Sequence, residues 1–226
     1  MADNVVVAQG YKCRYCGLIY VNEHSCKEKD MEERKQKAYE NVERAAEIMI
    51  KGMYLDLGTP ELEETPRRIA KMYVNELCRG LFDPKPKMTT FPNPKCDEMV
   101  MVKDIDVHSL CEHHFVPFIG KAYVAYIPNE KIVGLSKIVR LVDWCARRPQ
   151  VQERLTQQIA EELQTLLKPK GVAVFMQCHH LCMMIRGVNQ QGLCSTTKVL
   201  GNFIENSATR KEFFDTINIE GGYRWK

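Results

Sequence analysis

Apolar positions in the first half of the chain recur at helical spacing. From about Met31 they alternate in steps of three and four between charged residues, which predicts an amphipathic helix with one wet face. Thr65 and Pro66 form a typical start signal for a second helix, an N-cap followed by proline at N1, and Gly80 closes it. The apolar positions are Tyr39, Val42, Ala46, Met49 and Met53 in the first helix, and Ile69, Met72, Tyr73 and Leu77 in the second.

The second half alternates between strand-like and helical patterns. Residues 99–107, 121–127, 172–183 and 196–200 are predicted strands, and residues 84–94 a connecting loop. Between the second and third strands lie two helices, the first with Ser136 as N-cap and the second ending near residue 168; a short helix follows at 207–217. This order predicts an α+β domain, an antiparallel sheet with helices on one face. We expect three regions: a cysteine-rich extension (1–30), a helical region (31–95) and this α+β domain (96–226).

Composition narrows the function classes. The 226 residues carry a formal net charge of only +3, which argues against a nucleic-acid partner but suits a small anionic substrate. No apolar run approaches the ~20 residues of a transmembrane helix, and the first residues lack the pattern of a signal peptide. We therefore expect a cytoplasmic protein without a membrane partner, whose ten cysteines are reduced thiols rather than disulfides.

Cysteine and histidine gather in two short strings. Cys111 and His114 are three residues apart, so one tight turn can bring both to the same metal. In the second string, Cys178, His180 and Cys182 share one face if the chain stays extended. Four protein ligands would make a structural zinc site, and three would leave a position for a water whose pKa can fall to about 7. Nearby histidines could then transfer protons.

A third group lies near the N-terminus. Cys13, Cys16, His24 and Cys26 form a C-x-x-C pair followed by H-x-C, and four such residues in a short span could close a tetrahedral zinc site. The alternative is a thiol-rich tail that binds no metal.

Several longer strings resemble the GTP cyclohydrolase I family over roughly residues 35–217. They are Cys-Glu-His-His at 111–114, Gly-Leu-Ser-Lys at 134–137, Arg-Arg-Pro-Gln-Val-Gln-Glu-Arg-Leu-Thr at 147–156, His-Leu-Cys at 180–182 followed by Arg186-Gly187, and Glu-Thr-Pro at 64–66 followed by Arg68 to Tyr73. The resemblance implies the tunnelling fold, with the strand-strand-helix-helix-strand-strand unit, and a decamer of two stacked pentameric rings with active sites between subunits. It also implies conversion of GTP to 7,8-dihydroneopterin triphosphate and formate. Folate, tetrahydrobiopterin and deazaguanine synthesis can all start from that step.

The resemblance also assigns roles. The implied zinc ligands are Cys111, His114 and Cys182, and the implied proton-transfer residues are His113 and His180, with Ser136 assisting the ring-opening steps. Glu153 resembles the purine anchor, because a carboxylate can accept hydrogen bonds from both the amide N–H and the amine of guanine. The remaining implied substrate contacts are Val151 and Gln152 next to that anchor, and Lys137, Arg140, Arg186, Arg68 and Lys71 around the triphosphate.

Two alternatives remain open at this level. A tunnelling-fold enzyme that acts on a pterin without zinc would keep Glu153 but would not need two cysteines and a histidine together. A non-enzymatic protein with a structural metal would need a fourth ligand, for instance His113 or Cys178.

Overall fold

The computed structural model describes residues 5–7, 10–12, 19–20 and 28–218, which form two compact units, 1–85 and 86–226. The first unit opens with the short strands β1 (Val5–Val7), β2 (Gly10–Lys12) and β3 (Ile19–Tyr20), which pair antiparallel in that order. Cys13, Cys16, His24 and Cys26 lie outside the described residues.

Helices make up most of the described residues from 28 to 85. The long helix α1 (Glu28–Gly52) contacts α2 (Thr65–Lys71), which continues as the π-helix η1 (Met72–Leu77) and the 3-10 turn η2 (Arg79–Leu81). The predicted apolar stripes hold in part, since Ala46 is buried whereas Met53 and Met72 are exposed. In the second helix the buried positions include Ala70 and Val74, which the sequence did not predict. The predicted N-cap was wrong: Glu64 occupies that position, and Thr65 is the first helical residue, directly before Pro66.

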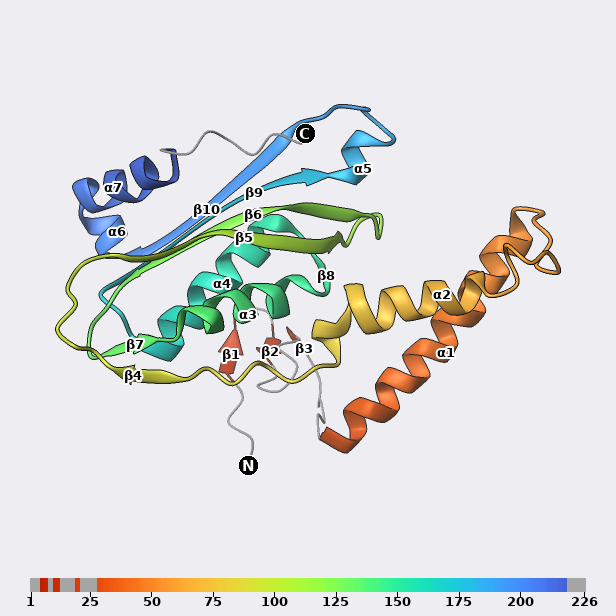
Figure 1. Ribbon diagram of the computed structural model, residues 1–226, viewed down its shortest axis with the longest axis horizontal. Coiled ribbons are helices and arrows are strands. Elements are labelled where there is room, and N and C mark those ends of the chain that lie inside the picture. The colour runs from red at the N-terminus through yellow and green to blue at the C-terminus, as the bar shows by residue number, and fades with distance from the viewer. Residues whose placement is uncertain (1–4, 8–9, 13–18, 21–27, 219–226) are drawn as a thin grey trace. The chain divides into compact units, whose positions relative to one another are not determined.

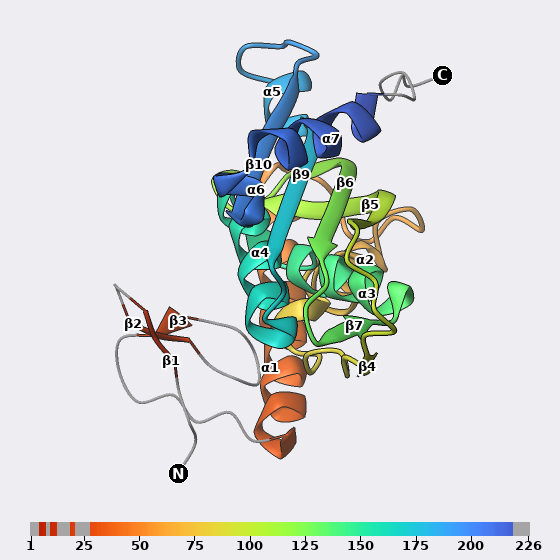
Figure 2. The same cartoon turned by 90° about the vertical axis from the view of Figure 1, so that its left-hand side faces the viewer.

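A five-stranded sheet organises the second unit (Figure 2). Its order is β10-β9-β6-β5-β8, from β5 (Val100–Cys111), β6 (Pro117–Ile127), β8 (Pro149–Gln150), β9 (Gly171–His180) and β10 (Leu193–Gly201). All pairs are antiparallel except the short β5–β8 pair. A separate two-stranded antiparallel sheet pairs β4 (Thr90–Pro92), inside the predicted loop, with β7 (Lys131–Val133).

Two helices cover one face of this sheet. The helix α3 (Leu135–Ala146) buries the predicted face of Ile138, Leu141, Val142 and Cys145, and α4 (Gln152–Leu167) buries Leu155, Ile159 and Leu163 at steps of four. Gly134, not Ser136, is the N-cap of α3, and no side chain caps that helix. Burial of these side chains against the strands forms the main core.

The expectation of helices on one face was incomplete. The short helix α6 (Asn202–Glu205) and α7 (Ser207–Asn218) lie on the opposite side of the sheet from α3 and α4 (Figure 1). Phe203 and Phe213 are fully buried there with Ala125 and Ala173 of the strands, in a second, smaller core. The unit is a mixed α+β structure with helices on both faces of its sheet.

Strand direction decides where the polar residues meet. Because β5 and β9 are both antiparallel to β6, they run the same way, and both end beside the start of β6. Leu110 pairs with Pro117 and His180 pairs with Phe118, so the chain leaves both strands at one edge of the sheet. The short helix α5 (Leu181–Met184) follows β9 directly.

Candidate metal centre

Two thiols and one imidazole converge at this edge. One donor atom each from Cys111, His114 and Cys182 lies within 4.8 Å of the other two. Cys111 is the last residue of β5, His114 lies in the turn that follows, and Cys182 lies in α5. β9 ends at His180, so the predicted strand to residue 183 was too long, and Cys182 reaches the cluster from a helical turn.

The turn after β5 is held by main-chain hydrogen bonds. The amides of His114 and Phe115 donate to the carbonyl oxygen of Cys111, at 3.3 and 2.8 Å, and the amide of Cys111 donates to Val116 at 2.9 Å. Phe115 has a φ of 53°, the left-handed conformation that lets the chain reverse within so few residues. The turn therefore presents the side chains of Cys111 and His114 from a closed loop.

The donor set matches what zinc prefers. Thiolate and imidazole are its usual protein ligands, and three of them leave a fourth position open. Burial raises the pKa of the Cys182 thiol, and the adjacent Cys111 raises it further, so the two sulfur atoms are close neighbours. Cys178 is fully buried in the core, where burial raises its pKa to about 12. It packs in the core and is not in the donor cluster.

Two histidines flank the cluster. His113 Nδ1 lies 3.6 Å from Cys111 Sγ, and its side chain is exposed. The ring of His180 stacks on Phe118, with centroids 4.7 Å apart and an interplanar angle of 9°. Burial lowers the pKa of His180, and the nearby charge of Glu153 partly opposes that shift. His180 is thus favoured as the neutral ring at neutral pH.

Two of the expected substrate residues reach the same edge. Glu153, exposed in the first turn of α4, is close enough to influence both His180 and Cys194 electrostatically. Arg186, beyond α5, places Nη1 2.9 Å from His114 Nε2. A cation beside the cluster favours an anionic ligand there.

The remaining expected residues belong to two other helices. Ser136, Lys137 and Arg140 belong to the first turns of α3, where Ser136 and Arg140 are exposed. Arg68 and Lys71 belong to α2 in the first unit, where Arg68 Nη2 donates to the carbonyl oxygen of Glu61 at 2.8 Å and to Thr65 Oγ1 at 2.9 Å.

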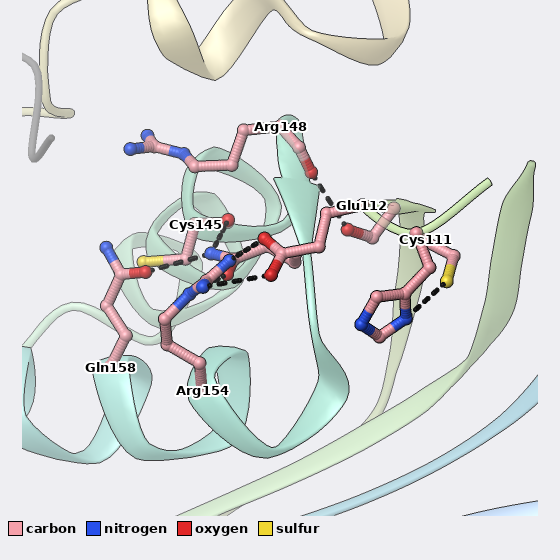
Figure 3. Close-up of polar contacts among 9 residues, drawn as sticks. Cys111, Glu112, Cys145, Arg148, Arg154 and Gln158 are labelled. Carbon is pink, nitrogen blue, oxygen red and sulfur yellow. Dashed lines mark hydrogen bonds and ion pairs between the residues drawn. The ribbon is translucent and has the colours of Figure 1, made fainter. Parts of the chain in front are cut away.

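The sequence did not predict an ion pair that holds the turn after β5, residues 111–116, which we call the metal turn. Arg154 in the first turn of α4 faces Glu112, which lies between Cys111 and His113 (Figure 3). The guanidinium contacts both carboxylate oxygens, Nη1 donating to Oε1 at 3.3 Å and Nη2 to Oε2. This contact lowers the pKa of Glu112, while slight burial opposes the shift. No local charge pattern in the sequence indicates this ion pair, because Glu112 and Arg154 are 42 residues apart.

Gln150 extends this ion pair into the fold. Its Oε1 accepts from Arg154 Nε at 2.9 Å, and its Nε2 donates to the carbonyl oxygen of Cys145 at 3.1 Å and to Gln158 Oε1 at 3.0 Å (Figure 3). Its main-chain oxygen accepts from the amide of Glu112 at 3.1 Å. The metal turn is thereby fixed to both α3 and α4.

The family model and the curated relatives that match this chain carry the same family name. The sequence model of the family described as GTP cyclohydrolase I matches residues 42–218. A protein of Sulfurihydrogenibium sp. (strain YO3AOP1) named GTP cyclohydrolase 1 is 49% identical over 180 residues, which span 78% of this chain and 94% of that protein. Proteins of the same name from Aliivibrio salmonicida and Yersinia enterocolitica are 50% and 47% identical, over 82% and 86% of this chain and 85% and 88% of their own lengths.

Within residues 28–218, every helix is too short or too polar to cross a lipid bilayer. With a family match over most of its length and relatives of about half identity, this chain belongs to the GTP cyclohydrolase I family of hydrolases.

Proposed function

We propose that the protein is a zinc-dependent GTP cyclohydrolase that converts GTP to 7,8-dihydroneopterin triphosphate and formate. The carrying observation is the Cys111–His114–Cys182 cluster at the shared end of β5 and β9, in a chain of this family. These three residues would hold the metal. A bound zinc would act as a Lewis acid that makes a water molecule nucleophilic at neutral pH.

The chain's own residues would bind GTP and move protons. Glu153 would accept two hydrogen bonds from the amide N–H and amine of guanine, a donor pair that adenine lacks. Val151 and Gln152 are further expected contacts at the purine. His113 would protonate the purine nitrogen next to carbon 8 and make that carbon more electrophilic. Hydration there opens the imidazole ring to a formamide, and a second hydration releases formate.

His180 and Ser136 would assist the later opening and rearrangement of the ribose. The triphosphate needs several cations, and we assign Arg186, beside His114, together with Lys137 and Arg140 near the N-terminus of α3. Arg68 and Lys71 on α2 complete this set, in part from a neighbouring subunit.

The two edges of the sheet support the ring assembly implied for the family. Among the described residues, β10 is one edge strand, and at the other edge β8 pairs only with Leu110 and Cys111 of β5. Strand edges with unpaired main-chain groups readily take up a strand of another chain. We propose that tunnelling-fold subunits join edge to edge in pentameric rings and that two rings form a decamer; light scattering that shows a monomer in solution would contradict this.

The experiment combines product and metal assays on one sample. Incubation with GTP should release formate and yield a pterin that fluoresces after oxidation, and a chelator should abolish both. Cys182→Ala should lose zinc and activity together, whereas His113→Ala should keep zinc and lose formate release. If His113→Ala loses the metal and Cys182→Ala keeps it, the ligand assignment is wrong and a structural metal is favoured.

The N-terminal group Cys13, Cys16, His24 and Cys26 remains a proposed second zinc site on its spacing alone. A zinc content above one per chain that falls to one when residues 1–30 are deleted would support it. A content of one in the full chain would exclude it.

A further inference from the structure

Gln152 is a buried polar residue at the start of α4, and its side chain reaches the strands rather than solvent. It is 2% exposed. Its Nε2 lies 3.2 Å from the carbonyl oxygen of Met176 in β9, 3.0 Å from that of Cys194 in β10 and 3.0 Å from Thr196 Oγ1. Its Oε1 lies 2.8 Å from Nε2 of His180. Both ends of the amide are therefore occupied by the protein.

These neighbours fix which way the amide points. Two of the three atoms around Nε2 are carbonyl oxygens, which can only accept, so the NH2 group must face them. The flipped amide would set Oε1 against two oxygens and leave the buried carbonyls without their donor. The oxygen of Gln152 consequently faces His180 and can only accept from it.

The same reasoning fixes the tautomer and the orientation of the His180 ring. Because its partner is an acceptor, Nε2 of His180 carries the hydrogen in the neutral ring, and Nδ1 keeps the lone pair. Stacking on Phe118 fixes the plane of the ring, and the amide fixes its rotation within that plane.

We propose that Gln152 is a positioning residue that holds His180 in one orientation and one tautomer, and that it does not contact the purine. This inference rests on the proposed function only for the catalytic role of His180; the pairing itself is independent of it. It reassigns Gln152 from the substrate-contacting group to the support of His180, and leaves Glu153 next to it as the purine anchor.

The test variant is Gln152→Met, which keeps most of the volume but removes the amide. Thr196→Val is the matched control, because it removes another hydrogen-bond partner of the same amide and leaves the His180 contact intact. We expect kcat of Gln152→Met to fall about tenfold or more with KM for GTP and zinc content little changed. Added to His180→Asn, Gln152→Met should cause no further loss, since residues that act as a unit are not additive. A raised KM with unchanged kcat would make Gln152 a purine contact and overturn the proposal.

A spectroscopic measurement tests the pairing of Gln152 with His180 separately from the proposed enzymatic function. In protein labelled with [15N]histidine, the ring nitrogens of His180, assigned by their loss in His180→Asn, should show a protonated Nε2 and a bare Nδ1. Gln152→Met should change that pattern and Thr196→Val should keep it. A bare Nε2 in the wild-type protein refutes the proposal even if Gln152→Met does not fold. If no formate is released from GTP, the proposed function fails, while the nitrogen spectrum still decides the pairing.

Discussion

The ion pair between Glu112 and Arg154 should contribute to zinc affinity although neither residue is a ligand. Glu112 lies directly after Cys111, and Arg154 lies on the rigid first turn of α4. The proposed ligands Cys111 and His114 belong to this turn, and a contact that orders the turn before the metal binds reduces the entropy lost on binding. Glu112→Gln removes the charge and keeps the shape, and Arg154→Met removes the guanidinium.

The structure sets the size of the effect. The side chains are 34% and 46% exposed, so most of the Coulomb attraction is screened by water. With Nη1 and Oε1 3.3 Å apart, the attraction in bulk water is about 1.3 kcal/mol. Exposed pairs measure roughly 0.2–1 kcal/mol, and a two-point contact supported by Gln150 belongs at the upper end. A coupling of about 1 kcal/mol corresponds to roughly fivefold in zinc affinity.

The assay is competition with a chromophoric zinc chelator, applied to both single variants and the double variant. We expect each single variant to bind zinc about fivefold more weakly and the double variant hardly more weakly than either. Asp215→Asn, which breaks an exposed pair with Lys211 on α7, is the control and should leave zinc affinity unchanged. If Glu112→Gln weakens zinc binding equally in the wild-type protein and in Arg154→Met, the two residues are not coupled and the reasoning is refuted.

The pair also has a defined pH dependence. Arg154 holds the pKa of Glu112 below its unfolded value, so the carboxylate binds fewer protons in the folded state. Its contribution to stability is complete above the unfolded pKa of about 4.3 and is lost as pH falls through the lower folded value. The difference in unfolding free energy between wild type and Glu112→Gln should therefore be constant from neutral pH to about pH 5 and shrink below that.

Three further predictions test packing, thiol reactivity and substrate grip. Gly120→Ala should lower the unfolding free energy by about 3 kcal/mol or more in a denaturant titration, because its Cβ would lie 2.0 Å from a carbonyl oxygen of β9. The control is Gly192→Ala, whose Cβ meets nothing within 4 Å and whose unfolding free energy should stay near that of the wild type. Equal losses of unfolding free energy in the two variants would contradict the close approach of the strands at Gly120. In native protein treated with iodoacetamide, mass spectrometry should find Cys178 unmodified, because burial raises its pKa to about 12. Cys182 should be modified only after zinc is removed. Equal labelling of Cys182 with and without zinc would count against its role as a ligand. Glu153→Gln should raise KM for GTP about tenfold or more while zinc content stays the same, and an unchanged KM would remove it as the purine anchor.

Periodicity predicted the helices of the second unit well because their burial is one-sided. In α4, Leu155, Ile159 and Leu163 recur at steps of four, and each is fully buried. The side of the sheet that a helix covers is not encoded in its periodicity. The helix α7 was therefore predicted near its observed bounds, but its packing on the opposite face came only with the structure.

The cluster itself could be predicted only in part. Cys111 and His114 lie in one turn, so their spacing suffices, but Cys182 joins them because β5 and β9 both flank β6 and run the same way. That direction follows from strand order, which local sequence does not determine. The side-chain contacts that support the site span 28 residues from Gln152 to His180 and 42 from Glu112 to Arg154, and no local pattern marks them.

Three consecutive residues at the start of α4 reach different parts of the site. Successive helical side chains are rotated by about 100°, so Gln152, Glu153 and Arg154 must point in three directions. Gln152 points inward to His180 at the end of β9, Arg154 reaches Glu112 in the turn after β5, and Glu153 stays exposed as the proposed purine anchor. Since Leu155 anchors the same turn in the core, one rigid helical start fixes the proposed proton-transfer residue, the turn after β5 and the proposed purine anchor relative to one another. Such common support is what a reaction needs when a purine must be held by one residue while its carbon 8 meets groups carried by two strands.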